Sequence, residues 1–201
     1  LAIDDMKSCT FVETDTTANQ VAHWAVSVQL NQGDNSIPTK EPTESSNNCN
    51  TVALLMNNCP EYVSFWLGMA KVGCSTALVN TNSRGKTLVH SIHAGLASTP
   101  ASRRYVVADT DGMLALNIAS VRNALNEANI KIIHYNDLLL NTFPNVRPSY
   151  SLREHVLEGD AMLYIYTSGT TGMPKASKIS HGRYTVSCHP LRINCNMSSN
   201  D

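Results

Sequence analysis

The sequence contains no long run of apolar residues, no excess of charge of either sign and no closely spaced pair of cysteines. A helix that crosses a bilayer needs about 20 consecutive apolar residues, so we expect no membrane-spanning helix in this sequence. The 15 Lys and Arg residues nearly balance the 16 Asp and Glu residues, and the net charge of -1 indicates no general affinity for nucleic acid. Any site that binds phosphate therefore depends on a local arrangement of donors.

The 6 cysteines are too dispersed for a zinc site or a dithiol redox motif. We interpret them as reduced thiols, and Cys74 as a small apolar side chain packed beside a buried strand. His90 and His93 lie one helical turn apart without a third ligand, so we predict no metal site. The sequence begins without Met and without the apolar core of a signal peptide, so we expect no targeting signal in this chain.

Short apolar runs of strand length alternate with segments in which apolar residues recur at helical spacing. We expect strands at residues 52–56, 75–79, 105–108, 130–135 and 161–166. We expect helices at residues 17–30, 60–73, 83–96 and 114–125, and a helical turn at residues 137–140. This alternation predicts an α/β fold with a mainly parallel sheet and helices on both faces.

Residue types at the helix ends predict where some of these helices begin and end. Thr16 or Thr17 would cap the first helix and Ser83 the third, because a hydroxyl oxygen accepts a hydrogen bond from a free backbone N–H group. Pro60 suits the first turn of the second helix, and Gly73 suits the position that follows its end.

Two polar stretches interrupt the regular pattern. Residues 31–50 are rich in Asn, Ser, Thr, Pro and acidic residues, which is typical of a surface loop. Residues 141–160 contain Pro144 and Pro148, which oppose regular structure. We therefore expect two polar loops within one folded region.

The segment after the last expected strand carries the main functional signal. Glycines let a backbone approach an anion closely, hydroxyls donate to phosphate oxygens, and a lysine adds positive charge. The carboxyl end of a strand is also where α/β sheets commonly bind ligands. We therefore predict nucleotide and phosphate binding, with a Ser- and Gly-rich surface turn as the alternative. The residues concerned are Thr167, Ser168, Gly169, Thr170, Thr171, Gly172 and Lys175.

The spacing of these residues differs from that of two common nucleotide-binding loops. Lys175 lies three residues after Gly172 and is not followed directly by Ser or Thr, so the pattern is neither G-x-x-x-x-G-K-[ST] nor G-x-G-x-x-G. The run Tyr164-Ile-Tyr-Thr-Ser-Gly-Thr-Thr-Gly-Met-Pro-Lys175 instead resembles the signature loop of the adenylate-forming superfamily. That superfamily includes acyl-CoA synthetases, luciferases and peptide-synthetase adenylation domains.

A second segment narrows the resemblance to one branch. Residues 58–74, followed by residues 77–84 with Asn80-Thr-Asn82 and Arg84, are similar to the fatty-acid transport proteins, or very-long-chain acyl-CoA synthetases. The resemblance extends over residues 10–184 and is weaker in the two polar loops.

The resemblance implies a ligase reaction in two steps. A fatty-acid carboxylate attacks the α-phosphate of ATP with the help of Mg²⁺, pyrophosphate leaves, and the acyl group passes from AMP to the thiol of coenzyme A. Donors around the β- and γ-phosphates stabilise such a leaving group. The implied ligands are fatty acid, ATP, Mg²⁺ and coenzyme A. Membrane association, at the endoplasmic reticulum or plasma membrane, is implied through regions outside this chain.

The resemblance also implies that the chain is the amino-terminal part of a longer enzyme. The Mg-binding glutamate, ribose-binding aspartate and catalytic lysine of the family come from regions beyond the loop, so we assign no catalytic residue here. We divide the chain into a partial AMP-binding domain, residues 1–184, and a divergent tail, residues 185–201, which its polar composition and Pro190 predict to be irregular.

Three interpretations stay open. The chain represents a long-chain fatty acid-CoA ligase linked to fatty-acid uptake, a lipid-transport protein without ligase activity, or a truncated, non-catalytic fragment that retains only the phosphate-binding loop. In each case we expect the isolated chain to lack ligase activity.

Overall fold

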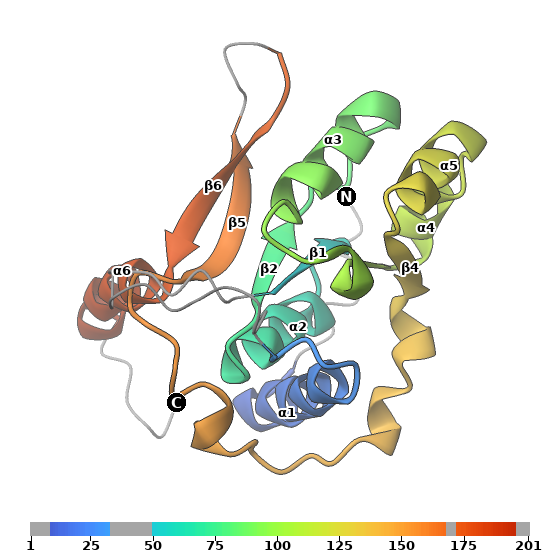
Figure 1. Cartoon of the computed structure of the whole chain (residues 1–201). Helices are drawn as coiled ribbons and strands as arrows, with labels where there is room; N and C mark the ends of the chain where they lie inside the picture. The colour runs from blue at the N-terminus through green and yellow to red at the C-terminus, as the bar shows by residue number, and fades with distance from the viewer. Residues whose placement is uncertain (1–8, 33–49, 168–171, 196–201) are drawn as a thin grey trace, which may run out of the picture.

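A single sheet of six strands forms the centre of the computed structural model, which describes residues 9–32, 50–167 and 172–195 (Figure 1). The strands are β1 (Thr51–Leu55), β2 (Ser75–Leu78), β3 (Tyr105–Ala108), β4 (Lys131–His134), β5 (Ala161–Thr167) and β6 (Lys175–Ser180). Their order across the sheet is β4-β3-β1-β2-β5-β6. Neighbouring strands are parallel except for β5 and β6, which are antiparallel. The predicted mainly parallel sheet is confirmed.

Helices cover both faces of the sheet, as predicted for an α/β fold (Figure 1). One face packs against α1 (Phe11–Ser27) and α2 (Pro60–Lys71). The other face packs against α3 (Gly85–Gly95), α4 (Thr110–Leu116) and α5 (Ala119–Glu127).

The central strand β1 contributes to both hydrophobic cores, because successive side chains of a strand point to opposite faces. Val52 and Leu54 face α1 and α2, where the rings of Trp24 and Phe65 lie 5.9 Å apart between centroids. Cys74 is fully buried in the same core, as the sequence predicts. The intervening residues of β1 face α3, α4 and α5.

Helix α1 begins earlier than its sequence pattern predicts. Thr10 is the cap in place of Thr16 or Thr17, since its hydroxyl accepts a hydrogen bond of 3.2 Å from the Glu13 backbone N–H group. The Glu13 carboxylate accepts one of 2.8 Å from the Thr10 backbone in return, which completes a capping box. Ser83 does not cap α3, which starts two residues further on and has no side-chain cap.

The segment expected to form one helix over residues 114–125 forms the two helices α4 and α5. Asp109 caps α4, and its carboxylate accepts a hydrogen bond of 2.7 Å from a backbone N–H group in the first turn. Ile118 has extended backbone angles, φ -60° and ψ 124°, and separates the two helices. Leu114 is 68% exposed and Ile118 46% exposed, although both belong to the apolar pattern that predicts a helix over residues 114–125.

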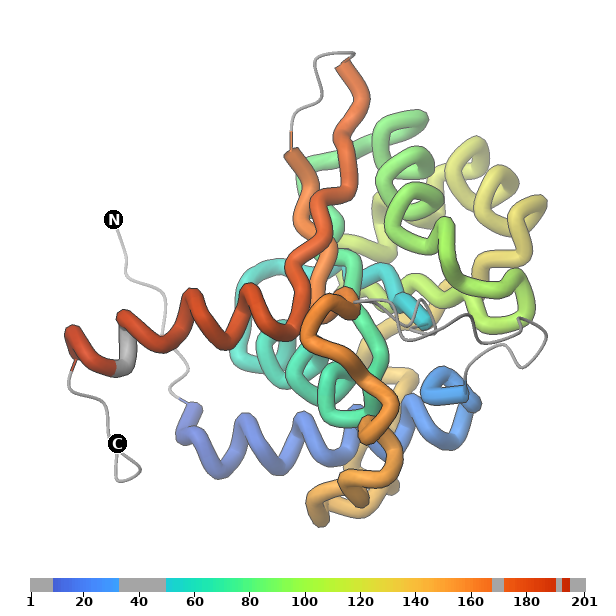
Figure 2. Tube along the Cα trace, turned by 60° about the vertical axis from the view of Figure 1, so that its left-hand side comes forward, coloured from blue at the N-terminus to red at the C-terminus, as the bar shows by residue number. Residues whose placement is uncertain are grey.

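The segment after the expected phosphate loop contains two elements that the sequence pattern does not predict. Strand β6 pairs with β5, and α6 (His181–Asn194) follows it and points away from the sheet (Figure 2). The irregular structure predicted from residue 185 is therefore wrong as far as residue 194, and Pro190 lies within the helix. The first two backbone N–H groups of α6 donate to the carbonyl oxygens of Asp160 at 3.1 Å and Glu158 at 2.9 Å, which anchors the start of the helix.

The connection between β4 and β5 contains three short 3-10 turns, Tyr135–Leu138, Leu140–Thr142 and Tyr150–Leu152, and is otherwise irregular. Most of the polar loop predicted at residues 31–50, namely residues 33–49 with Cys49, lies outside the described residues. Each cysteine in the described ranges is a free thiol. No helix in those ranges is both long enough and apolar enough to cross a bilayer.

Candidate functional site

Three of the predicted phosphate-binding residues, Thr167, Gly172 and Lys175, lie on the hairpin of β5 and β6, which extends beyond the neighbouring strands (Figure 1). Thr167 ends β5 and Lys175 begins β6, and the two residues pair directly in the antiparallel register. Both side chains are exposed. The structure thus brings the two ends of the predicted site together. Its central residues lie outside the described ranges: Ser168, Gly169, Thr170 and Thr171.

Gly172 lies just before β6, and no described residue covers its backbone. Its φ of +82° lies in the left-handed region, which favours glycine over residues with a side chain. A Cβ atom built at Gly172 would meet no atom within 4 Å, so the space around this residue is free of other described atoms. The described residues therefore leave the backbone at Gly172 uncovered, and anion binding at this position stays a prediction.

The loop that follows β2 lies at the same edge of the sheet as the hairpin. Leu78 pairs with Ile165 in the parallel register, so Asn80 and Thr167 each come two residues after the same point in the sheet. The loop after β2 and the end of β5, two segments singled out in the sequence, therefore lie at the same edge of the sheet.

Polar side chains stabilise the loop after β2 internally. The Asn80 carboxamide oxygen accepts a hydrogen bond of 2.8 Å from the Asn82 backbone N–H group. The Arg84 guanidinium donates to the carbonyl oxygens of Thr81 and Ser83, the latter at 2.8 Å. Arg84 therefore maintains the shape of this loop, a role that the sequence pattern alone does not show.

Helix α3 contacts both arms of the hairpin. The Tyr166 hydroxyl donates to the Ser91 carbonyl oxygen at 2.6 Å, and the His90 Nε2 atom lies 3.1 Å from the Pro174 carbonyl oxygen. Burial raises the pKa of Tyr166 far above its ordinary value, so the hydroxyl keeps its proton and remains a donor. Sequence reasoning missed these contacts, because their partners are 75 and 84 residues apart.

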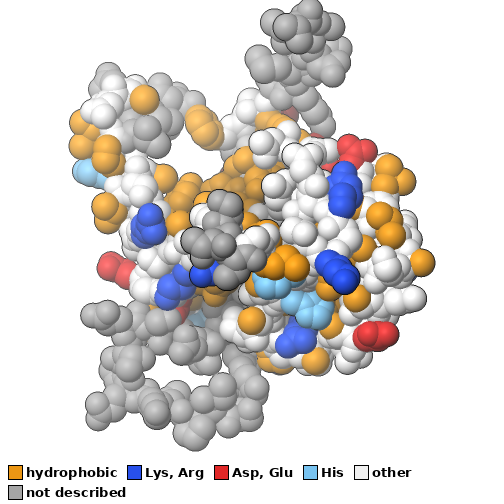
Figure 3. All heavy atoms as spheres, turned by 90° about the horizontal axis from the view of Figure 1, so that it is seen from above, with side chains coloured by type: hydrophobic (Ala, Val, Ile, Leu, Met, Phe, Trp, Pro, Cys, Tyr) orange, Lys and Arg blue, Asp and Glu red, His pale blue; other side chains and the backbone are white. Residues whose placement is uncertain are grey.

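A cavity of about 410 Å³ lies beside α3 and α5. Burial is the main cause that lowers the pKa of His93, and the electrostatic effects of Arg104 and then of His90 lower it further. In the view from above, His side chains lie next to Lys and Arg side chains on this part of the surface (Figure 3). The cavity therefore offers donors and apolar surface. Its lining is Gly85, Lys86, Val89, His90, His93, Ser120, Val121 and Ala124.

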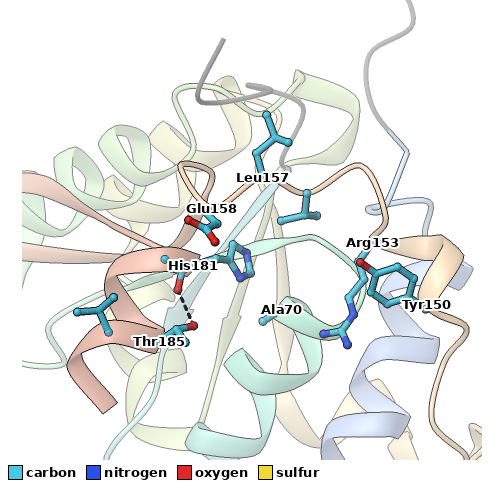
Figure 4. A pocket seen from close by; sticks show the side chains of 10 residues that line it. Ala70, Tyr150, Arg153, Leu157, Glu158, His181 and Thr185 are labelled. Carbon is cyan, nitrogen blue, oxygen red and sulfur yellow. Dashed lines mark hydrogen bonds between the residues drawn. The ribbon is translucent and has the colours of Figure 1, made fainter. Parts of the chain in front are cut away.

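A second cavity, of about 290 Å³, lies at the opposite end of the hairpin (Figure 4). Its wall includes Arg153, Glu158 and His181, which come from the connection before β5 and from the start of α6. The His181 Nε2 atom is buried without a hydrogen-bond partner in the described part of the chain. Burial lowers the pKa of His181 and favours the neutral ring. His181 thus belongs to the anchorage of α6, apart from the predicted phosphate site.

A mainly parallel α/β sheet that ends in a hairpin rich in Gly and Thr has the architecture of the amino-terminal domain of adenylate-forming enzymes. The sequence model of the family described as AMP-binding enzyme matches residues 1–199. The chain belongs to the AMP-binding enzyme family.

Among curated proteins, the chain is similar to fatty-acid transport proteins. It is 35% identical over 133 residues to the very long-chain fatty acid transport protein of Cochliobolus heterostrophus. The aligned region covers 66% of this chain and 19% of that protein. It is 33% identical over 182 residues to the human long-chain fatty acid transport protein 6. Here the aligned region covers 85% of this chain and 25% of that protein. The chain thus spans a quarter or less of the length of these relatives.

Solved structures of acyl-CoA ligases share the fold. The N-terminal domain of FACL13 from Mycobacterium tuberculosis, bound to an inhibitor, has a TM-score of 0.61 at 22% identity, over 86% of this chain and 37% of that one. The anthranilate CoA ligase AuaEII in complex with anthranoyl-AMP has a TM-score of 0.67 at 18% identity, over 90% of this chain and 32% of that one. Identities this low establish the fold alone.

Proposed function

We propose that this chain supplies the phosphate-binding part of a ligase that uses ATP to activate long-chain or very-long-chain fatty acids to acyl-CoA. The observation that carries the proposal is the β5–β6 hairpin, where Thr167 pairs with Lys175 and Gly172 leaves the backbone open. Similarity to long-chain fatty acid transport proteins supports the substrate class. We further propose that the whole protein acts at a membrane and links activation to fatty-acid uptake.

The proposed chemistry assigns the hairpin a stabilising role. A carboxylate oxygen of the fatty acid forms a bond to the α-phosphorus of ATP while the bond to the bridging oxygen of pyrophosphate breaks. Hydroxyl and amide donors from Thr167 to Gly172, with the Lys175 ammonium, would hold the β- and γ-phosphates and stabilise the charge of the leaving pyrophosphate. The nucleophile is the substrate itself, so the hairpin needs no general base. Acyl transfer to coenzyme A follows.

Mg²⁺ would reach this site with the nucleotide. Within the described ranges, no group of three or more His, Cys, Asp or Glu side chains could hold a metal ion. Mg²⁺ in ATP-dependent sites is commonly bound through the phosphates of the substrate and one or two carboxylates. When bound there, the ion neutralises phosphate charge.

A calorimetric titration with Mg-ATP tests the role of the hairpin. Lys175→Met is expected to weaken binding about tenfold or more, because it removes a hydrogen bond that is assisted by charge. Lys178→Met is the matched control, since Lys178 lies on the same strand and donates to the Gly159 carbonyl oxygen at 3.0 Å. Absence of heat and of a thermal shift for the unmodified chain at millimolar Mg-ATP would remove the proposal.

A second candidate function is nucleotide binding without catalysis. Its support is that the predicted site consists of residues of the β5–β6 hairpin and includes no residue with an assigned catalytic role. Formation of acyl-CoA from fatty acid, ATP and coenzyme A by the isolated chain would favour the complete ligase. Mg-ATP binding without product would favour a phosphate-binding unit that acts within a longer protein.

A further inference from the structure

Both arms of the β5–β6 hairpin form a hydrogen bond with the same turn of α3. On the first arm Tyr166 donates to the Ser91 carbonyl oxygen, and on the second arm Pro174 accepts from His90. We propose that His90 and Tyr166 are positioning residues that hold the two arms of the β5–β6 hairpin, which flank the predicted phosphate-binding loop, against α3. The ligand named in this inference rests on the proposed function, whereas the fastening of the hairpin does not.

The hairpin needs such support because it extends beyond the strand next to it in the sheet. Strand β2 pairs with β5 only as far as Leu78 and Ile165, so no strand on that side supports the later residues of β5. A hairpin of two strands is marginally stable by itself in water. Ordering it when a phosphate binds would cost conformational entropy, and contacts made beforehand reduce that cost.

The contact of His90 requires a proton on Nε2, because a carbonyl oxygen only accepts hydrogen bonds. Both the neutral ring with a proton on Nε2 and the imidazolium satisfy this requirement, so the contact does not depend on charge. The groups around His90 in the neighbouring cavity are His93 and Lys86, with Arg104 beside His93.

The contact of Tyr166 depends on the absence of a side chain at Gly95. A Cβ atom at Gly95 would lie 2.5 Å from the Ala77 Cβ atom and closer still to the Tyr166 hydroxyl. Contacts this close are essentially never made by real Cβ atoms. The last residue of α3 therefore lets the hydroxyl reach the backbone of the helix.

Hydrogen exchange of the β5–β6 peptides and Mg-ATP titration test the inference together. His90→Ala is expected to speed exchange around Thr167 and Lys175 and to weaken binding about three- to tenfold, the effect of one lost hydrogen bond. His90→Gln, which keeps a donor of similar reach, is expected to restore most of both. The matched control is His23→Ala on α1, which removes a similar contact of 3.0 Å with the Val146 carbonyl oxygen. It should change neither readout.

Tyr166→Phe tests the first arm and keeps the ring, so it also serves if His90→Ala fails to fold. Faster hairpin exchange in either variant supports the inference even if the unmodified chain binds no Mg-ATP, in which case only the proposed function fails. Unchanged exchange and unchanged affinity in both variants would overturn the inference. A second outcome would overturn it as well: His90→Ala weakens Mg-ATP binding, His90→Gln does not restore it, and hydrogen exchange of the hairpin stays unchanged.

Discussion

Two parts of the sheet differ in how helices cover them: strands β1 and β3, here called the covered half, and strands β5 and β6, here called the exposed half. Every residue of β1 and β3 is buried between helices, whereas β5 becomes partly exposed after Leu163 and no residue of β6 is fully buried. The covered half carries the two large hydrophobic cores, and the exposed half carries the predicted phosphate-binding residues. Stability and the proposed ligand binding thus concern different parts of one sheet, and substitutions in the two parts should have different effects.

The largest expected effect is in the covered half. Phe65 is fully buried, and its ring lies 5.9 Å from that of Trp24 and 6.5 Å from that of Tyr135. Phe65→Ala should lower the free energy of unfolding by about 3–5 kcal/mol, because it leaves a cavity in the core. Ile165→Ala, at a residue 43% exposed on β5, should cost less than about 1 kcal/mol. Urea denaturation measures both, and equal losses would contradict the division.

A smaller effect is expected where the two halves meet. Gly95→Ala should lower the free energy of unfolding by about 1–3 kcal/mol, since the added methyl group collides with Ala77 and Tyr166. Gly172→Ala adds a methyl group in open space and should cost about 1–2 kcal/mol through its left-handed backbone alone. Thermal unfolding gives the losses, and hydrogen exchange separates them: only Gly95→Ala should loosen the contact with α3.

The anchorage of α6 should respond to pH. Burial lowers the pKa of His181 below its ordinary value of 6.5, so the unfolded chain binds this proton more readily than the folded chain does. The contribution of the neutral ring is therefore present above pH 6.5 and is lost as the pH falls below it. Hydrogen exchange of α6 at a series of pH values measures this loss, and His181→Phe should abolish the dependence. A helix that loosens equally in both proteins would refute the assignment.

The smallest effect is expected from an ion pair between α1 and α2. The hydrogen bond from Lys71 lowers the pKa of Asp15 from 3.8, so the contribution of this pair is present above that pH and is lost as the pH falls through the lower folded value. Asp15 is half exposed, and exposed pairs contribute about 0–1 kcal/mol. Acid denaturation of Asp15→Asn should therefore shift slightly. A shift as large as that of Phe65→Ala would show that the pair was underrated.

Sequence patterns predicted the covered half of the sheet well, because its strands are short apolar runs and its helices carry continuous apolar stripes. Thr10 and Glu13 have the spacing of a capping box and mark the start of α1, but the apolar stripe from which a helix is predicted begins several residues later. The break at Ile118 was missed for a similar reason, because the spacing of apolar residues continues across it.

The exposed half could be predicted only in part. The motif at residues 164–175 predicted a loop after β5 but not strand β6, and the partners that position the hairpin, His90 and Ser91, lie far away in the sequence. The helix that replaces the expected irregular tail likewise starts on carbonyl groups of Glu158 and Asp160. Contacts of this kind leave no periodic signal. Phosphate binding by residues 167–172 and Lys175, and the division of the chain at residue 184, stay predictions.

The antiparallel direction of β6 has a consequence for the electrostatics of the loop. In nucleotide-binding loops that lead into a helix, the helix dipole places partial positive charge at the phosphate. Here the loop leads into a strand, whose net dipole is small. Attraction for an anion therefore depends on Lys175 and on oriented hydroxyl and amide groups. Because Lys175 is exposed, added salt should screen its attraction strongly, and nucleotide affinity should fall with ionic strength.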